Sequence, residues 1–168
     1  CSPQCAVALS QQKEKEKWNK RKEKLKEEIK TLTDWKKDLE REVNQIVRIL
    51  DNGKACISCT GKVEQAGHYH SVGSNDSLRF NFHNIHGSCI HCNMHKSGNI
   101  IEYDNGLIKR YGREYWEDVK FNLVRLYPLV KFTVADLQFA ITEARKIKKE
   151  LKSINLILPN EARLKMTD

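Results

Sequence analysis

Four cysteines stand in two Cys-x-x-Cys pairs, and this spacing is typical of a metal-binding thiolate set. The first pair is Cys56 and Cys59, and the second is Cys89 and Cys92. Two thiolates separated by two residues can chelate one ion from a tight turn, and two such pairs complete the tetrahedron that structural zinc prefers. Cysteines at this spacing also form disulfides, but the four together favour a structural Zn²⁺ ion.

Three polar side chains between and directly after these pairs are candidates for phosphodiester hydrolysis. A neutral imidazole such as His68 can take the proton from an attacking water. Asn84 is placed to hold His68 or its loop by hydrogen bonds. Asn93 directly follows the last cysteine and offers a hard oxygen donor, which Mg²⁺ and Mn²⁺ prefer. The zinc would stay remote from this chemistry, because four thiolates leave no open coordination position.

The charge of the chain favours a polyanionic partner. The 168 residues carry a formal net charge of +8 and give a pI near 9.2. DNA or RNA is the first candidate, although composition alone does not separate nucleic acid from an acidic membrane surface. No apolar run is long enough for a membrane span and no signal peptide is visible, so we expect a cytoplasmic protein. Four basic residues near the cysteine pairs are candidate DNA contacts: Arg79, Lys96, Lys109 and Arg110.

A long charged segment precedes the cysteine pairs and predicts a helix. Residues 10–50 contain no Gly or Pro, and apolar residues recur along them in an a/d pattern. The stripe consists of Trp18, Leu25, Ile29, Leu32, Leu39, Val43, Ile46 and Leu50. We favour a coiled coil that joins two copies of the chain, and a solvated helix packed on its own domain is the alternative. An N-cap at residues 31–34 would instead split the segment and favour an intramolecular hairpin.

The rest of the chain predicts a small zinc-braced core followed by helices. We expect two short strands, at 63–70 and 80–87, and a helix that opens near Asn93. Residues 100–111 fit a helix better than an Asn-Gly hairpin, and further helices are expected at 114–126 and 133–152. The last helix has a basic face that is either solvated surface or a phosphate contact: Arg145, Lys146, Lys148, Lys149 and Lys152.

These elements predict a mostly helical α+β fold with a small compact core. Such a core gains from a metal staple, because zinc bound only by the folded state adds its binding free energy to folding. The expected divisions are residues 1–9, a long helix or coiled coil at 10–52, the zinc and catalytic core at 53–112, basic C-terminal helices at 113–158 and a tail at 159–168.

The order of the motifs resembles that of the His-Asn-His nuclease superfamily, whose core is a two-strand-plus-helix (ββα) metal fold. The first cysteine pair, Gly67-His68, Asn84 and the second pair with Asn93 follow one another at the intervals of that superfamily. Asn in place of a final His is similar to endonuclease VII of a T-even phage, a Holliday-junction resolvase. The resemblance implies that His68 is the general base and that Asn84 and Asn93 belong to the catalytic site.

A closer resemblance, over nearly the whole chain, is to the phage lambda NinG family of recombination endonucleases, also called Rap. It rests on residues 1–5, the Cys56 pair, and residues 66–69, 78–81, 89–93, 97–99, 102–103 and the helix opened by Thr133. The resemblance implies cleavage of branched DNA, such as Holliday junctions or D-loops, in the cytoplasm of a bacterial host. It also implies catalytic Mg²⁺ or Mn²⁺ at Asn93. A homodimer would suit near-symmetric cutting of two strands.

Two features depart from the families that the chain resembles. Nucleases of this type often place Asp before the general-base His as a metal ligand, and this chain has Gly67 there. The candidate replacements are Glu64, His70, His95 and Glu102. Family members generally carry another upstream cysteine pair, so Cys1 and Cys5 resemble half of a truncated zinc knuckle, and the alternative is two incidental thiols. The rival function is a zinc-stapled DNA-binding or scaffold protein without catalysis.

Overall fold

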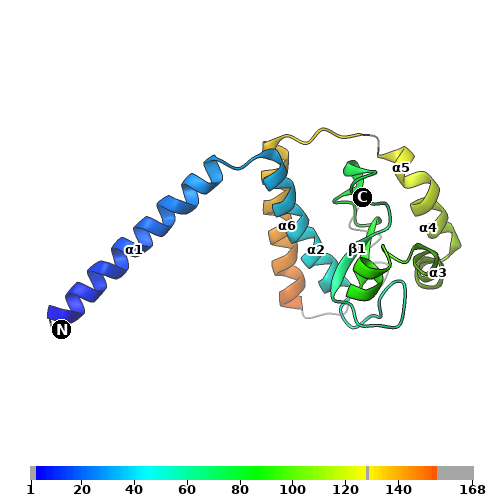
Figure 1. Ribbon diagram of the computed structural model, residues 1–168, viewed down its shortest axis with the longest axis horizontal. Coiled ribbons are helices and arrows are strands. Elements are labelled where there is room, and N and C mark those ends of the chain that lie inside the picture. Colours follow the sequence, from blue (N-terminus) through cyan, green and yellow to red (C-terminus); the bar gives the residue numbers. More distant parts are fainter. Residues whose placement is uncertain (1–2, 128, 155–168) are drawn as a thin grey trace. The chain divides into compact units, whose positions relative to one another are not determined.

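The computed structural model describes residues 3–127 and 129–154 (Figure 1). By its internal contacts the chain divides into an N-terminal unit, Cys1–Trp35, and a C-terminal unit, Lys36–Asp168. Cys1 and the tail expected at 159–168 lie outside the described residues. Among the helices of the described ranges, none combines the length and the apolar character that a membrane crossing requires.

The N-terminal unit contains α1 (Pro3–Glu28) and the start of α2 (Leu32–Leu50). These two helices take the place of the single long helix expected over residues 10–50. The Thr31 amide donates to Asp34 Oδ2 at 3.0 Å, and the Asp34 amide donates to Thr31 Oγ1 at 3.3 Å. This reciprocal capping box starts a new helix at Leu32. The split at residues 31–34, weighed as an alternative, is confirmed.

α1 keeps large apolar side chains exposed, and so does the turn that follows it. Trp18 is 62% exposed, Leu25 51% and Ile29 78%. Cys5 also lies exposed on this helix. The first half of the a/d stripe is therefore not used inside its own unit, and the coiled coil stays a prediction.

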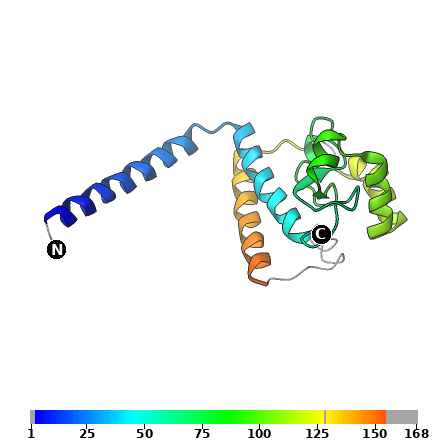
Figure 2. The same ribbon diagram turned by 60° about the horizontal axis from the view of Figure 1, so that its bottom comes forward.

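The second half of the same stripe is buried in the C-terminal unit. Its buried members are Leu39, Val43, Ile46 and Leu50, and the neighbouring Val47 is buried as well. α6 (Val134–Ile154) runs beside α2 in both views (Figures 1 and 2). The α6 positions that are buried are Leu137, Ile141 and Ala144. The heptad positions from Leu39 onward thus serve the core of their own chain, which corrects their expected role in a seam between two copies.

Ion pairs turn part of the basic face of α6 toward α2. Arg145 Nε lies 3.2 Å from Glu42 Oε1, and Lys148 pairs with the same carboxylate. Lys148 also donates to Gln45 Oε1 at 3.0 Å. Lys148 is therefore largely covered and leaves the expected solvated or phosphate-binding face, whereas the side chain of Arg145 stays 64% exposed on it. α6 begins where predicted, because the Thr133 amide donates to Asp136 Oδ2 at 2.8 Å in a second capping box.

A two-stranded antiparallel sheet and a short helical turn surround the candidate site. β1 (Gln65–His68) pairs with β2 (Ile85–Ser88), and His68 lies opposite Ile85. A wide helical turn, η2 (His91–His95), follows. β2 begins later than the strand expected at 80–87, because the preceding residues form successive turns that include η1 (Asp76–Leu78).

Three helices close the core: α3 (Ile100–Tyr111), α4 (Arg113–Glu117) and α5 (Leu123–Leu126), with a wide turn η3 (Asp118–Asn122) before α5. The helical interpretation of residues 100–111 is confirmed. A Cβ at Gly106 would lie 1.7 Å from the Ile57 carbonyl oxygen, so glycine lets α3 approach the first cysteine turn. Asn105-Gly106 therefore serves close packing in a helix rather than a hairpin turn.

Candidate metal centre and active site

The four paired cysteines converge on one point. Their Sγ atoms all lie within 4.8 Å of one another, and Cys59 Sγ lies 3.6 Å from Cys89 Sγ. Zn–S bonds of about 2.3 Å place the sulfurs of a tetrahedral site roughly 3.8 Å apart. The clustering that the spacing predicted is confirmed, and the set can hold a structural metal such as zinc.

Each sulfur also receives at least one N–H group, which favours its thiolate form, whereas burial raises the pKa of Cys59 and Cys92. The donors are the amide of Ser58 to Cys56 at 3.4 Å, the amide of Gly61 to Cys59 at 3.3 Å, the amide of Cys92 to Cys89 at 3.3 Å and the side chain of Asn99 to Cys92 at 3.6 Å. Because four thiolates would fill the coordination sphere, the metal at this centre would brace the fold and take no part in catalysis.

His68 ends β1 with one ring nitrogen held and the other open. Its Nε2 lies 3.0 Å from the Arg79 carbonyl oxygen. A carbonyl can only accept, so Nε2 carries the hydrogen and Nδ1 has the lone pair. Burial lowers the pKa of His68 below its ordinary value of 6.5, against the opposing effects of the Arg79 carbonyl and the Glu40 carboxylate. The imidazole is therefore neutral at about pH 7 and can accept a proton at Nδ1.

Asn93 lies beside the strand residue that precedes His68. Its Nδ2 donates to Gln65 Oε1 at 2.7 Å. A Cβ built at Gly67 would lie 3.0 Å from Asn93 Oδ1, which places the amide oxygen over the β1 backbone. Oδ1 accepts no hydrogen bond from a described residue, so this oxygen is available as a ligand for a metal ion.

His68 and Asn93 line one cavity of about 780 Å³. The residues that line it with them are Glu40, Arg41, Asn44, Gln45, Arg48, Gln65, Ala66, Ser71, Val72, Ser97 and Gly98. Five of these come from α2, which the sequence did not connect with the site. No local signal marks them, since polar positions on a charged helix look like solvated surface.

Asn84 is buried, and it holds the loop between the strands rather than the His68 ring. Its Oδ1 accepts from the His70 amide at 2.7 Å, and its Nδ2 donates to the carbonyl oxygens of His70 at 3.0 Å and Leu78 at 3.1 Å. These bonds set the course of the chain toward Arg79, whose carbonyl holds His68. Asn84 therefore acts on the site through the backbone.

Tyr103 on α3 supports the backbone of β1, and the sequence did not identify it as part of the candidate site. Its hydroxyl donates to the Gly67 carbonyl oxygen at 3.0 Å and lies 3.0 Å from His86 Nδ1. Both Tyr103 and His86 are buried. The backbone that carries His68 is thus fixed by a polar contact with α3.

The four candidate DNA contacts have different surroundings. Arg79 Nη1 lies 2.9 Å from Glu40 Oε2, and its Nε lies 2.8 Å from Asp76 Oδ1, so its charge is balanced inside the protein. Arg110 donates to the Ala55 carbonyl oxygen at 2.8 Å and braces the first cysteine turn. Lys96 is exposed next to the cavity residue Ser97, and Lys109 is exposed beside the cysteine turn.

The candidate replacements for a carboxylate at position 67 do not line the His68 cavity. Glu64 Oε2 accepts from the Ile90 amide at 3.2 Å, and His70 Nε2 lies 2.7 Å from the Val119 carbonyl oxygen. His95 is exposed on η2, and Glu102 lies beside the cysteine turn. The geometry brings none of them to His68.

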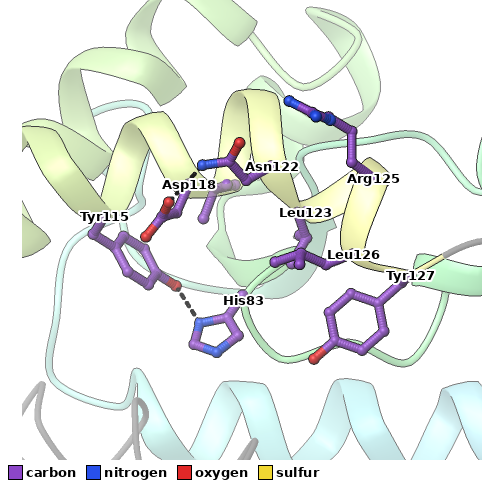
Figure 3. A pocket seen from close by; sticks show the side chains of 9 residues that line it. His83, Tyr115, Asp118, Asn122, Leu123, Arg125, Leu126 and Tyr127 are labelled. Atoms are coloured by element: carbon purple, nitrogen blue, oxygen red, sulfur yellow. Dashed lines mark hydrogen bonds between the residues drawn. The ribbon is translucent and has the colours of Figure 1, made fainter.

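A second cavity, of about 640 Å³, lies along α4, η3 and α5 (Figure 3). In it Tyr115 Oη lies 3.1 Å from His83 Nδ1, and Asn122 donates to Asp118 Oδ1 at 2.8 Å. It shares no lining residue with the His68 cavity. The two cavities are separate features of the C-terminal unit.

Comparison with known proteins identifies the family. The model described as Bacteriophage Lambda NinG protein matches residues 3–154. Protein ninG of Escherichia phage lambda is 32% identical over 174 residues, covering 91% of this chain and 83% of the relative. Protein ninG of Salmonella phage P22 is 36% identical over 133 residues, covering 67% and 66%, and that of Escherichia phage 933W is 40% identical over 91 residues, covering 52% and 45%. No solved structure matches the chain. The chain therefore belongs to the NinG family of bacteriophage proteins.

Proposed function

We propose that this protein is a metal-dependent endonuclease that cleaves branched DNA, such as Holliday junctions or D-loops, during phage recombination in the host cytoplasm. The observation that carries the proposal is the shared cavity of His68 and Asn93, next to a cysteine cluster that fits zinc. A neutral base and an open hard-oxygen donor in one cavity are what metal-assisted phosphodiester hydrolysis requires.

His68 acts as the general base in this proposal. Its Nδ1 takes the proton from the attacking water, while the Arg79 carbonyl keeps the ring oriented through Nε2. Asn93 Oδ1 holds a divalent cation, Mg²⁺ or Mn²⁺, which neutralises charge on the phosphate when bound. Asn84 keeps the loop backbone in place and touches no reacting group.

Basic side chains at the rim of the cavity are suited to the DNA backbone. Arg41 and Arg48 on α2 line the cavity, and Lys96 is exposed beside it. The net charge of +8 supports a nucleic-acid partner. Lys109 and Arg110 would contact DNA only if it passes over the first cysteine turn.

A homodimer fits the task of cutting two strands of one junction. The members of the heptad stripe that stay exposed are available for pairing with a second copy, and they are Trp18, Leu25, Ile29 and Leu32. The dimer would then be formed by the N-terminal unit, mainly through α1, since the heptad positions from Leu39 onward are buried in the C-terminal unit.

The test is incubation of the zinc-loaded protein with labelled linear, flapped and four-way DNA, with and without EDTA at concentrations that leave the structural zinc bound. We expect cleavage of branched DNA that requires added Mg²⁺ or Mn²⁺. Binding of four-way DNA without any cleavage under all metal conditions would contradict the proposal. That result would favour a zinc-stapled DNA-binding protein.

A further inference from the structure

One wall of the His68 cavity is a polar face of α2. Its residues there are Glu40, Arg41, Asn44, Gln45 and Arg48. They recur at i, i+1, i+4, i+5 and i+8, so they share one side of the helix. The apolar side of α2 is buried in the core, which fixes this polar side toward the cavity. α2 therefore contributes side chains to the same space as His68 and Asn93.

Glu40 is the carboxylate of this cavity. Of the described residues that line it, Glu40 alone is acidic. Its Oε2 accepts from Arg79 Nη1 at 2.9 Å, while its Oε1 accepts no hydrogen bond from a described residue. Its negative charge acts on the His68 ring, although burial has the larger effect on the pKa of that ring. Glu40 thus lies within electrostatic reach of the base and has one oxygen open.

Asn44 follows Glu40 by one helical turn, and its amide oxygen is without a partner. Asn44 Oδ1 is buried and has no hydrogen bond to any described residue. Leaving a buried acceptor unsatisfied costs free energy, so this atom is suited to a cation that enters the cavity. A turn of the side chain toward the cavity breaks no hydrogen bond at Oδ1.

The space around Gly67 leaves little room for a carboxylate side chain on β1, whereas Glu40 provides one from α2. A Cβ at this residue would lie 3.0 Å from Asn93 Oδ1 and 3.1 Å from Ser88 Cβ. A carboxylate side chain at position 67 would therefore crowd the amide that is to bind the cation. Glu40 reaches the same cavity from α2 without that conflict.

We propose that Glu40 and Asn44 bind the catalytic divalent cation together with Asn93. The catalytic role of this cation rests on the nuclease function proposed above, whereas the cation-binding site itself does not. Protein sites for Mg²⁺ use one or two carboxylates, further oxygen donors and several waters, and this set provides one carboxylate and two amide oxygens. Ligands at i and i+4 of a helix lie on the same face and can share one ion.

The experiment measures Mn²⁺ binding to the zinc-loaded full chain without DNA, by the electron paramagnetic resonance signal of free Mn²⁺. Glu40→Gln keeps the size of the side chain but removes the charge, and it should weaken Mn²⁺ binding by about tenfold or more. Asn44→Ala should weaken it less. Glu64→Gln is the matched control, since Glu64 lies outside the cavity lining, and it should leave the affinity unchanged.

A gain-of-affinity variant keeps the inference testable if Glu40→Gln disturbs the fold through Arg79. Asn44→Asp adds a second carboxylate next to Glu40 and should tighten Mn²⁺ binding. Unchanged Mn²⁺ affinity in both Glu40→Gln and Asn44→Asp would overturn the inference, even if the unaltered protein cuts four-way DNA. Loss of Mn²⁺ binding in Glu40→Gln would support the site even if no DNA is cut, and the nuclease proposal alone would then fail.

Discussion

At the scale of single residues, the proposed nuclease chemistry depends on how His68 is held. The Arg79 carbonyl oxygen fixes the tautomer with the hydrogen on Nε2 and leaves Nδ1 as the proton acceptor. Arg79 is itself fixed by Glu40 and Asp76. The folded protein therefore holds a neutral, oriented imidazole at the end of β1.

We expect His68→Ala to lose cleavage of four-way DNA by about 10² to 10⁴-fold, which is the usual contribution of one acid–base group. Zinc content and branched-DNA binding should be retained, because His68 is no zinc ligand. His95→Ala is the control, since His95 is exposed outside the cavity, and it should cut at the normal rate. Asn93→Ala should be partly rescued by raised Mn²⁺, whereas His68→Ala should not. Normal cleavage by His68→Ala would refute its role as the base.

The pH dependence of cleavage should reflect the lowered pKa of His68. A base works only when unprotonated, so the rate should fall as pH drops through the pKa of the folded protein, which lies below 6.5. Arg79 on the same loop and Glu40 on α2 are the charged groups that act on this ring, and a bound dication would lower its pKa further. Single-turnover rates across the acid range would check this, and a midpoint above 6.5 would contradict it.

At the scale of elements, the Asp104 carboxylate joins the end of β1 to the helices that follow. Asp104 on α3 accepts from the Tyr69 hydroxyl at 2.6 Å, Trp116 Nε1 at 2.7 Å and Lys120 Nζ at 2.8 Å. Tyr69 directly follows β1, and the other two donors lie on α4 and η3. Burial acts to raise the pKa of Asp104, but these three donors outweigh it and hold the pKa below its ordinary value of 3.8.

Asp104→Ala should destabilise the C-terminal unit by about 2–3 kcal/mol, because it leaves the three partly buried donors Tyr69, Trp116 and Lys120 without their acceptor. Asp118→Ala is the matched control, since Asp118 is exposed and bonds only to Asn122 on its own turn. In the unaltered protein the contribution of Asp104 is complete above its unfolded pKa and is lost as pH falls through the lowered folded pKa, below 3.8. Urea unfolding at pH 7 checks the loss of stability in the variant, and urea unfolding in acid checks the pH dependence. Equal destabilisation by Asp104→Ala and Asp118→Ala at pH 7 would contradict the stabilising role of Asp104.

At the scale of the whole molecule, a metal at the four cysteines would join two distant parts of the chain. Cys56 and Cys59 lie in a turn after α2, while Cys89 and Cys92 lie at the end of β2 and on η2. The second pair is followed at once by Asn93. A zinc ion at this centre would therefore also position η2, which carries Asn93 of the candidate site.

Cys92→Ser should lower bound zinc well below one ion per chain and unfold or aggregate the C-terminal unit, because zinc binding contributes to folding. Cys5→Ser should change neither, since Cys5 lies on α1 outside the cluster. Elemental analysis and thermal melting check this. Absence of zinc from the unaltered native protein would contradict the zinc staple.

Trp18→Glu combined with Leu25→Glu should convert a dimer into monomers, because each places charge in an apolar seam. Both side chains are exposed on α1, so the C-terminal unit should keep its fold and its zinc. Sedimentation velocity at micromolar concentration provides the measurement. An unaltered chain that is already monomeric would exclude the α1 dimer.

The sequence alone determined the features that depend on residues close together in the chain. The two cysteine pairs, the capping boxes at Thr31 and Thr133 and the helix periodicity after Ile100 each depend on residues within a few positions of one another. Such local signals survive in any fold, since backbone geometry sets which side chains meet at i+3 and i+4. The two Cys-x-x-Cys spacings therefore predicted the clustering of the four cysteines without knowledge of the tertiary structure.

Only the tertiary structure decided which surfaces these elements share. The heptad residues from Leu39 to Leu50 look alike whether they face a second copy or α6, and burial in their own unit settled the question. Arg79, a candidate DNA contact, forms ion pairs with Glu40 and Asp76, and the pair with Glu40 joins residues 39 positions apart in the sequence. Glu40 and Asn44 line the His68 cavity because α2 contacts the segment between β1 and β2, where Arg79 follows Glu40 by 39 residues. Contacts between segments so far apart depend on the packing of the whole core, which no local spacing encodes.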